Sequence, residues 1–252
     1  MLAGEDKDEL EREVQAWCYR LERSGLRLNV KKTEYLTTDF TESSSIKVNG
    51  IELLRSSVFK YLGSAVASDG NLMTEVNSRV NAAWSKWRSL TGVLCDKKIP
   101  ERFKSKIYRT VIRPVVMYGA QCWPATKEVE TRLSVMETNM LRWTAGVTCM
   151  DRIRNGAIRQ KFGVAPIDDK MREARLRWYG HVLRRKEDSV RKIGFGLEVS
   201  GKRPRGRPKQ RWSDTLHTDM KVTDVHPDQA HDRERWRHDT RRADPATKRD
   251  KR

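Results

Sequence analysis

The chain has 252 residues, of which 37% are hydrophobic and 34% charged, and its formal net charge at pH 7 is +18. No apolar run approaches the roughly 18 residues that a membrane span needs, so we expect no membrane partner. A surface this basic attracts phosphate polymers, which favours nucleic acid as the partner over a small-molecule substrate.

The positive charge is spread unevenly along the chain. Residues 1–66 carry ten Lys and Arg against eleven Asp and Glu, whereas residues 67–150, 151–200 and 201–252 have net charges of +6, +6 and +7. This gradient predicts a body that closes over a polyanion, followed by a basic tail.

The start of the chain and its cysteines bear on location. "MLAGEDKDEL" has acids where a secretory signal would be basic and then apolar. The four cysteines are too far apart for a structural zinc site and fit reduced thiols, so no metal ion is expected. We expect a protein of the nucleus or of a cytoplasmic ribonucleoprotein.

The first predicted elements form a small α+β unit. Apolar residues at three- and four-residue steps predict a helix over residues 6–24. The alternating, β-branched stretch 26–40 then predicts a strand. Two further pairs of short strands are predicted at "IKVNGIELL" and "FKYLGS", with turns at Asn49-Gly50 and Gly63.

After residue 68 the pattern becomes helical, so the predicted fold is mainly α. Pro114 should kink or end the helix in which it lies. Residues 201–209 have no period and predict a linker. The predicted helices are Leu72–Leu94, Pro100–Val115, Val129–Met140, a short one near Ile153–Phe162, Met171–Val182, Trp212–Met220 and Asp228–Arg242.

An ordered series of motifs resembles the reverse transcriptases of non-LTR (LINE-like) retrotransposons. "DKDELEREVQAWCYRLERSGLRLNVKKTEYL" is similar to the palm segment that contains motif D, and "FKYLGS" resembles motif E, the primer-grip hairpin. "YRTVIRPVVMYGAQCW" resembles the thumb signature. "ARLRWYGHVLRR", "GRPKQRW" and "DRERWRHDTRRADP" resemble the carboxy-terminal region of the RTE-like branch.

The resemblance implies an organisation into four parts. They are the end of a palm over residues 1–66, a helical thumb over 67–148, a helical basic region over 149–200, and a basic linker with short carboxy-terminal helices over 201–252. The expected fold is therefore the remnant of a reverse transcriptase palm followed by a helical thumb and a basic helical tail.

The resemblance also gives Lys32 a role. In "KKT" it matches the motif D lysine, a proton donor near the pyrophosphate leaving group, and Lys31 is the alternative. The catalytic carboxylates have no match. The family holds two Mg²⁺ ions through an upstream aspartate and an "[FY]ADD" hairpin that would precede this chain, and Asp6 and Asp8 lie in a helix instead. We expect a truncated enzyme without a cofactor, which binds template RNA or target DNA but does not polymerise by itself.

Four residues match the primer grip: Phe59, Tyr61, Leu62 and Gly63. A glycine there allows the backbone to approach nucleic acid closely, and the flanking side chains would hold the terminal sugar. The alternative is an ordinary hairpin with Tyr61 and Leu62 packed inside.

The stretch "GKRPRGRPKQRW", beginning at Gly201, resembles an AT-hook. Arg205 and Arg207, on either side of Gly206, would read the narrow minor groove, while Arg203 and Lys209 would contact phosphates. An alternative function is therefore an AT-hook-type chromatin adaptor that binds DNA. The other interpretation is an extended basic linker ahead of the next helix.

Four Arg-Trp dipeptides recur in the basic part of the chain. Each tryptophan either anchors a helix while the neighbouring arginine stays in solvent, or stacks on unpaired bases. The dipeptides are Arg142-Trp143, Arg177-Trp178, Arg211-Trp212 and Arg235-Trp236.

Overall fold

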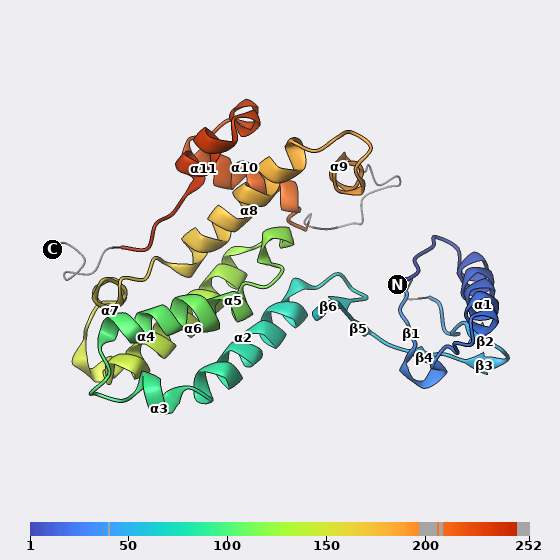
Figure 1. The fold of residues 1–252 in the computed structure, drawn as a ribbon, viewed down its shortest axis with the longest axis horizontal. Helices are drawn as coiled ribbons and strands as arrows, with labels where there is room; N and C mark the ends of the chain where they lie inside the picture. The colour runs from blue at the N-terminus through green and yellow to red at the C-terminus, as the bar shows by residue number, and fades with distance from the viewer. Residues whose placement is uncertain (40, 197–205, 207–208, 246–252) are drawn as a thin grey trace. The chain divides into compact units, whose positions relative to one another are not determined.

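The computed structural model describes residues 1–39, 41–196, 206 and 209–245. The chain divides into two compact units, Met1–Ser78 and Arg79–Arg252 (Figure 1). Over the described residues the chain is mainly helical, and its few short strands all lie in the first unit. The prediction of a mainly α fold with a small amino-terminal α+β unit is confirmed.

The first unit is built around helix α1 (Lys7–Arg23), as the apolar spacing predicts. Asp6 caps it, because its carboxylate accepts hydrogen bonds from the backbone N–H groups of Asp8 and Glu9. Its inner face packs on the strands that follow. The core consists of Val14, Cys18, Tyr35, Ile46, Val48 and Leu53.

The strands pair in twos. In both antiparallel hairpins the two turn residues have positive φ, the geometry that matches the twist of the strands (Asn49 and Gly50, then Leu62 and Gly63). The pairs are β1 (Glu34–Tyr35) parallel to β4 (Leu54–Arg55), β2 (Lys47–Val48) antiparallel to β3 (Ile51–Glu52), and β5 (Val58–Tyr61) antiparallel to β6 (Ser64–Ala67).

The predicted strand over residues 26–40 is wrong for most of its length. Residues Val30–Lys32 form a 3₁₀ turn instead, and the Thr33 hydroxyl donates to the Asn29 carbonyl at 2.9 Å. Only Glu34 and Tyr35 join a ladder, because β4 pairs with them over just two residues. Local hydrogen bonds thus replace the inter-strand bonds that a longer strand would need.

From residue 72 the described elements are helical. In chain order they are α2 (Leu72–Arg88), α3 (Thr91–Leu94), α4 (Glu101–Ile107), the π-helical turn Tyr108–Ile112, α5 (Arg113–Val116), η3 (Ala120–Cys122), α6 (Lys127–Ala145), η4 (Cys149–Asp151), α7 (Asn155–Phe162), α8 (Ile167–Leu183), α9 (Val190–Gly196), α10 (Trp212–Thr223), η5 (Pro227–His231) and α11 (Arg233–Thr240). None of the described helices is long and apolar enough to cross a bilayer.

Three predicted helices differ from those observed, and the one predicted over Asp228–Arg242 is divided into η5 and α11. The helix expected to reach Leu94 ends at Arg88, whose carbonyl accepts a hydrogen bond from the Thr91 hydroxyl, and a separate short helix follows. The helix that contains Pro114 continues to Val116. The wider π-helical turn just before Pro114 accommodates its ring and its missing N–H group.

Helix α8 is the centre of the second unit. It contacts α6 on one side and α10, α11 and η5 on the other, and Figure 1 shows it between the α10–α11 pair and the α5–α6 pair. Leu176 and Tyr179 of α8 pack in one buried cluster with Leu216, Met220 and Trp236. Because several helices surround α8, its buried residues extend beyond the single stripe that the sequence predicts.

Candidate nucleic-acid interface

The primer-grip candidates lie on the exposed β5–β6 hairpin. The rings of Phe59 and Tyr61 stack with centroids 6.4 Å apart, and Leu62 and Gly63 form the turn. Tyr61 is 39% exposed and Leu62 is 74% exposed, so these two side chains do not pack inside the unit. Their exposure leaves them accessible to a partner, and the primer-grip role remains a prediction.

Lys32 lies in the 3₁₀ turn between α1 and β1, and both it and Lys31 are exposed. The backbone N–H of Lys32 donates to the Asn29 carbonyl at 3.0 Å, which fixes the turn. Its side chain is therefore presented to solvent from a defined backbone. The structure does not favour Lys32 over Lys31 as the proton donor.

The AT-hook candidates are only partly described. Gly206 is exposed with a φ of +120°, and Lys209 is exposed, whereas Arg203, Arg205 and Arg207 lie outside the described residues. The chain is anchored directly afterwards. The Trp212 indole N–H donates to the carbonyl of Gln121 at 2.8 Å, at the start of α10. This anchor agrees with the linker interpretation and does not test groove reading.

The four Arg-Trp dipeptides do not behave alike. Trp236 is 2% exposed and donates its indole N–H to the Leu176 carbonyl at 2.9 Å, as a helix anchor should. In the Arg142-Trp143 pair the tryptophan is the exposed residue, with 65% of its side chain exposed, and the arginine is held by the chain, because it donates to the Thr148 carbonyl. Trp178 is half-buried, and it lines the cleft described next.

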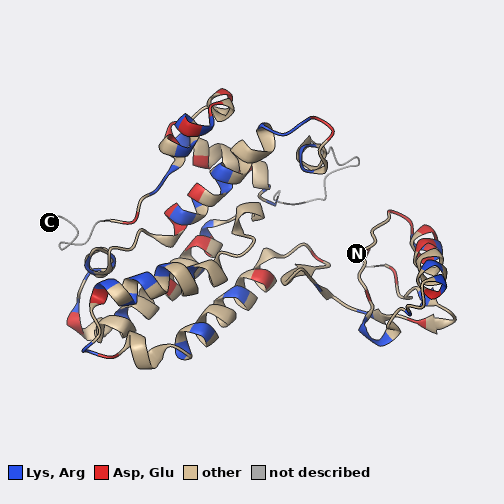
Figure 2. Ribbon diagram, in the orientation of Figure 1, with Lys and Arg blue, Asp and Glu red and all other residues tan. Residues whose placement is uncertain are grey.

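An arginine-lined cleft lies between α8 and α11 in the second unit and has a volume of about 850 Å³. Figure 2 shows Lys and Arg on both helices. Among its lining residues Trp236 and Thr240 are buried, whereas Trp178 and His181 are half-buried. The charged residues that line the cleft are Arg177, Arg184, Arg233, Arg237, Arg241 and Glu173.

The basic side chains of the cleft are all arginines. A guanidinium group stays charged, matches phosphate oxygens with two hydrogen bonds and stacks on flat rings, which a lysine ammonium does not. Burial, and then the nearby charge of Arg233, lower the pKa of Arg184. An anion in the cleft would offset the positive charge of these arginines.

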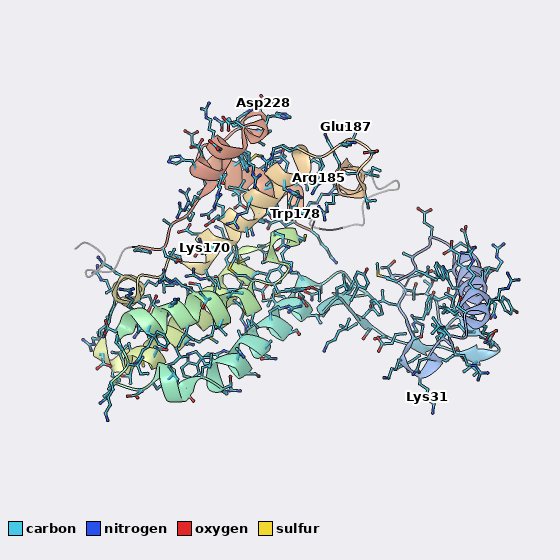
Figure 3. All side chains as sticks on the ribbon, viewed as in Figure 1. Lys31, Lys170, Trp178, Arg185, Glu187 and Asp228 are labelled. Atoms are coloured by element: carbon cyan, nitrogen blue, oxygen red, sulfur yellow. The ribbon has the colours of Figure 1, made fainter. Side chains whose placement is uncertain are left out.

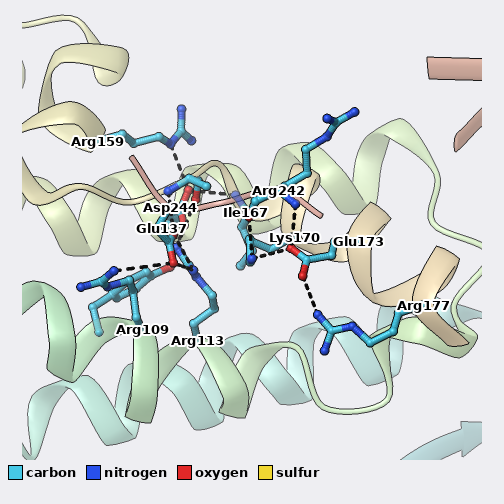
Figure 4. Close-up of polar contacts among 12 residues, drawn as sticks. Arg109, Arg113, Glu137, Arg159, Ile167, Lys170, Glu173, Arg177, Arg242 and Asp244 are labelled. Carbon is cyan, nitrogen blue, oxygen red and sulfur yellow. Dashed lines mark hydrogen bonds and ion pairs between the residues drawn. The ribbon is translucent and has the colours of Figure 1, made fainter. Parts of the chain in front are cut away.

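The carboxylate of Glu173 offsets part of the positive charge of the cleft, and three donors hold it in place (Figure 4). These donors are the ammonium of Lys170, the guanidinium of Arg177 and the backbone N–H of Arg242 at 3.2 Å. Burial alone would raise the pKa of Glu173, but the hydrogen bonds and the Lys170 charge outweigh it and lower that pKa. The carboxylate therefore stays ionised and fixes the wall of the cleft.

This lowered pKa predicts a pH-dependent contribution to stability. A carboxyl group whose pKa is lower in the folded chain than in the unfolded chain stabilises the fold at pH values above its ordinary pKa of 4.5. This stabilisation is lost as the pH falls through the lowered pKa of the folded chain. Glu173→Gln should therefore unfold more easily than the wild type at pH 7 in urea. The difference should shrink steadily below pH 4.5. If the two proteins differ in stability by the same amount at pH 7 and below pH 4.5, this role of Glu173 is contradicted.

The segment after α11 is tied down beside the cleft. Lys170 donates to the Arg242 carbonyl at 2.8 Å. The Asp244 carboxylate accepts hydrogen bonds from Arg113 at 2.9 Å and from the backbone N–H of Ala165 at 2.9 Å (Figure 4). These contacts hold Arg241 at the cleft.

Sequence reasoning missed the cleft because its two walls lie about fifty residues apart in the chain. One signal could have revealed it. Arg233, Arg237 and Arg241 recur at steps of four, which places them on one side of a helix. Both walls fall in motifs already matched to retrotransposon carboxy-terminal regions, but neither motif shows that the two pack together.

Comparisons with known proteins agree with a mobile-element source. Over 224 residues the chain is 24% identical to a transposon-derived, uncharacterized protein of Caenorhabditis elegans. The aligned region covers 84% of this chain and 79% of that protein. The similarity indicates a transposon origin. No family model matches the chain, and no solved structure is significantly similar to it.

Proposed function

We propose that this transposon-related chain is the carboxy-terminal part of a non-LTR retrotransposon reverse transcriptase. In this proposal, residues 1–66 are the end of the palm, and the helices from residue 67 form the thumb and the basic carboxy-terminal region. The chain binds nucleic acid and does not polymerise by itself. It acts in the nucleus or in a cytoplasmic ribonucleoprotein. The order of the sequence motifs and the transposon-derived relative support this assignment.

The arginine-lined cleft carries the nucleic-acid part of the proposal. Five guanidinium groups from α8, α11 and the residues directly after them line it. One of the five, Arg177, is paired with the carboxylate of Glu173, which also accepts from Lys170. Phosphates are the anions that such a cleft is best suited to bind. The overall charge of +18 would add attraction at longer range.

The test is the salt dependence of binding to labelled RNA and DNA strands. With about six phosphate contacts, a fourfold rise in salt should weaken binding roughly a thousandfold. Arg237→Ala combined with Arg241→Ala should weaken binding to every sequence and reduce the slope of log affinity against log salt by about two. Fluorescence anisotropy at several salt concentrations measures both quantities.

A matched control removes the same charge elsewhere. Lys127 and Arg132 are exposed on α6 and do not line the cleft, so replacing both with alanine should change the slope by less than about one. If the two double variants lose the same affinity for nucleic acid, or if the affinity does not change with salt concentration, the cleft is not the interface. The AT-hook function predicts instead a preference for A·T-rich duplex that Arg205→Ala with Arg207→Ala abolishes.

A further inference from the structure

We infer that the cleft binds single-stranded nucleic acid and that an unpaired base stacks on Trp178. This inference rests on the proposed function and adds the class of ligand. Trp178 lines the cleft together with Arg177 and His181 of the same helix. Figure 3 shows Trp178 and Arg185 towards the carboxyl-terminal end of α8, with Lys170 nearer its start.

The indole of Trp178 already takes part in stacking contacts. The Arg191 guanidinium lies 5.3 Å from its ring centroid, and the His181 ring lies 5.7 Å away at an interplanar angle of 32°. Trp178 is only half-buried and Arg191 is exposed. A base can therefore replace Arg191 over the indole, and the released guanidinium can then bind a phosphate of the same strand.

His181 is uncharged in this arrangement, so its ring adds no positive charge beside the indole. Its Nε2 atom contacts the guanidinium groups of Arg185 and Arg191 at 3.1–3.4 Å. Arginine only donates hydrogen bonds, so Nε2 must accept them and the ring carries its proton on Nδ1. Burial and the surrounding arginines, first Arg185 and then Arg191 and Arg184, lower the pKa of His181 and hold it neutral.

The geometry favours a single strand over a duplex. Paired bases stack on each other and present only their edges in the grooves, so their faces cannot reach an indole in the wall of a cleft. An unpaired base has a free face, and stacking on an aromatic side chain does not depend on sequence. Arg233 and Arg237 are exposed at the cleft, where they can contact the phosphates of such a strand, whereas Arg177 is paired with Glu173.

The experiment compares Trp178→Ala with the wild type on three ligands. They are a single strand of about 12 thymidine nucleotides, an abasic strand of the same length, and a duplex. About 12 nucleotides is within the range that one single-strand site covers. The wild type should bind the base-bearing strand more tightly than the abasic strand. Trp178→Ala should lose about 5- to 150-fold in affinity for the base-bearing strand and little for the abasic strand.

Two further variants keep the result interpretable. Trp178→Phe retains an aromatic ring and should keep most of the affinity, whereas Trp178→Ala could also disturb folding. Trp143→Ala removes an indole that is 65% exposed on α6 and does not line the cleft, and it should change nothing.

The experiment distinguishes failure of base stacking, of the preference for single strands and of the cleft as the interface. If Trp178→Ala weakens the abasic strand as much as the base-bearing strand, stacking is refuted while phosphate binding stands. If the duplex binds more tightly than the single strand and depends on Trp178 to the same extent, the single-strand class is refuted. If neither Trp178→Ala nor Arg237→Ala with Arg241→Ala affects any ligand, the cleft is not the interface and the proposed function fails with it.

Discussion

Glu137→Ala is expected to lower the free energy of unfolding of the helical unit by about 3–5 kcal/mol. The Glu137 side chain is fully buried on α6, where its carboxylate accepts hydrogen bonds from three other segments. Tyr108 donates from its hydroxyl at 2.8 Å, Arg159 from Nε at 3.0 Å and Ile167 from its backbone N–H at 3.2 Å. Alanine would leave the half-buried guanidinium of Arg159 and two buried donors without this acceptor.

Urea unfolding at pH 7 measures this loss. Asn139→Ala is a matched control, because Asn139 is exposed on the same helix and its replacement should change stability by less than about 0.5 kcal/mol. The loss of stability for Glu137→Gln should lie between those of the other two variants, since the glutamine amide keeps one acceptor oxygen. A loss below about 1 kcal/mol for Glu137→Ala would show that the contacts are not important for stability.

Gly180→Ala is expected to lower the free energy of unfolding by about 3 kcal/mol, the upper end of the usual range for overpacking. A Cβ atom at position 180 would lie 2.4 Å from Nε1 and 2.7 Å from Cδ1 of the Trp236 indole. Trp236 cannot move away without losing its hydrogen bond to the Leu176 carbonyl. The extra methyl group would therefore force α11 away from α8 and open one wall of the arginine-lined cleft.

Two comparisons make this prediction specific. Gly156→Ala on α7 places a Cβ with no heavy atom within 4 Å, so it should be neutral or stabilise by up to about 1 kcal/mol. Trp236→Phe removes the nitrogen that the new methyl group would meet. The double variant Gly180→Ala with Trp236→Phe should therefore lose less stability than the sum of the single variants. Additive losses in thermal unfolding would show that the two side chains do not meet.

The helices were predictable because their apolar spacing is regular. In α6 the predicted positions Val129, Leu133, Met136 and Met140 are all buried. The side-chain pattern does not predict the structure where the hydrogen-bonding partner decides it, as in the stretch around Val30–Lys32. Alternation of side chains predicts a strand there, but it does not reveal whether a second strand is available along its length.

The candidate site was less predictable than the fold because it depends on charges that pack in the interior. Arg175 is fully buried and donates from Nε to Asp219 at 2.6 Å, which joins α8 to α10. A hydrophobic pattern treats both residues as surface positions. The arginine-lined cleft depends likewise on the docking of α11 on α8, where the Trp236 indole donates to the Leu176 carbonyl, so its location could not be derived from the arginines alone.

The contact between Asp244 and Arg113 has a consequence for synthesis of the protein. The two residues are 131 positions apart, and the Arg113 guanidinium is almost completely buried when Asp244 is bound. A ribosome translating this message must therefore reach codon 244 before Arg113 gains its counter-ion. A stop codon or a frameshift before codon 244 would remove a partner of the interior, so selection for a folded product would extend at least to that codon.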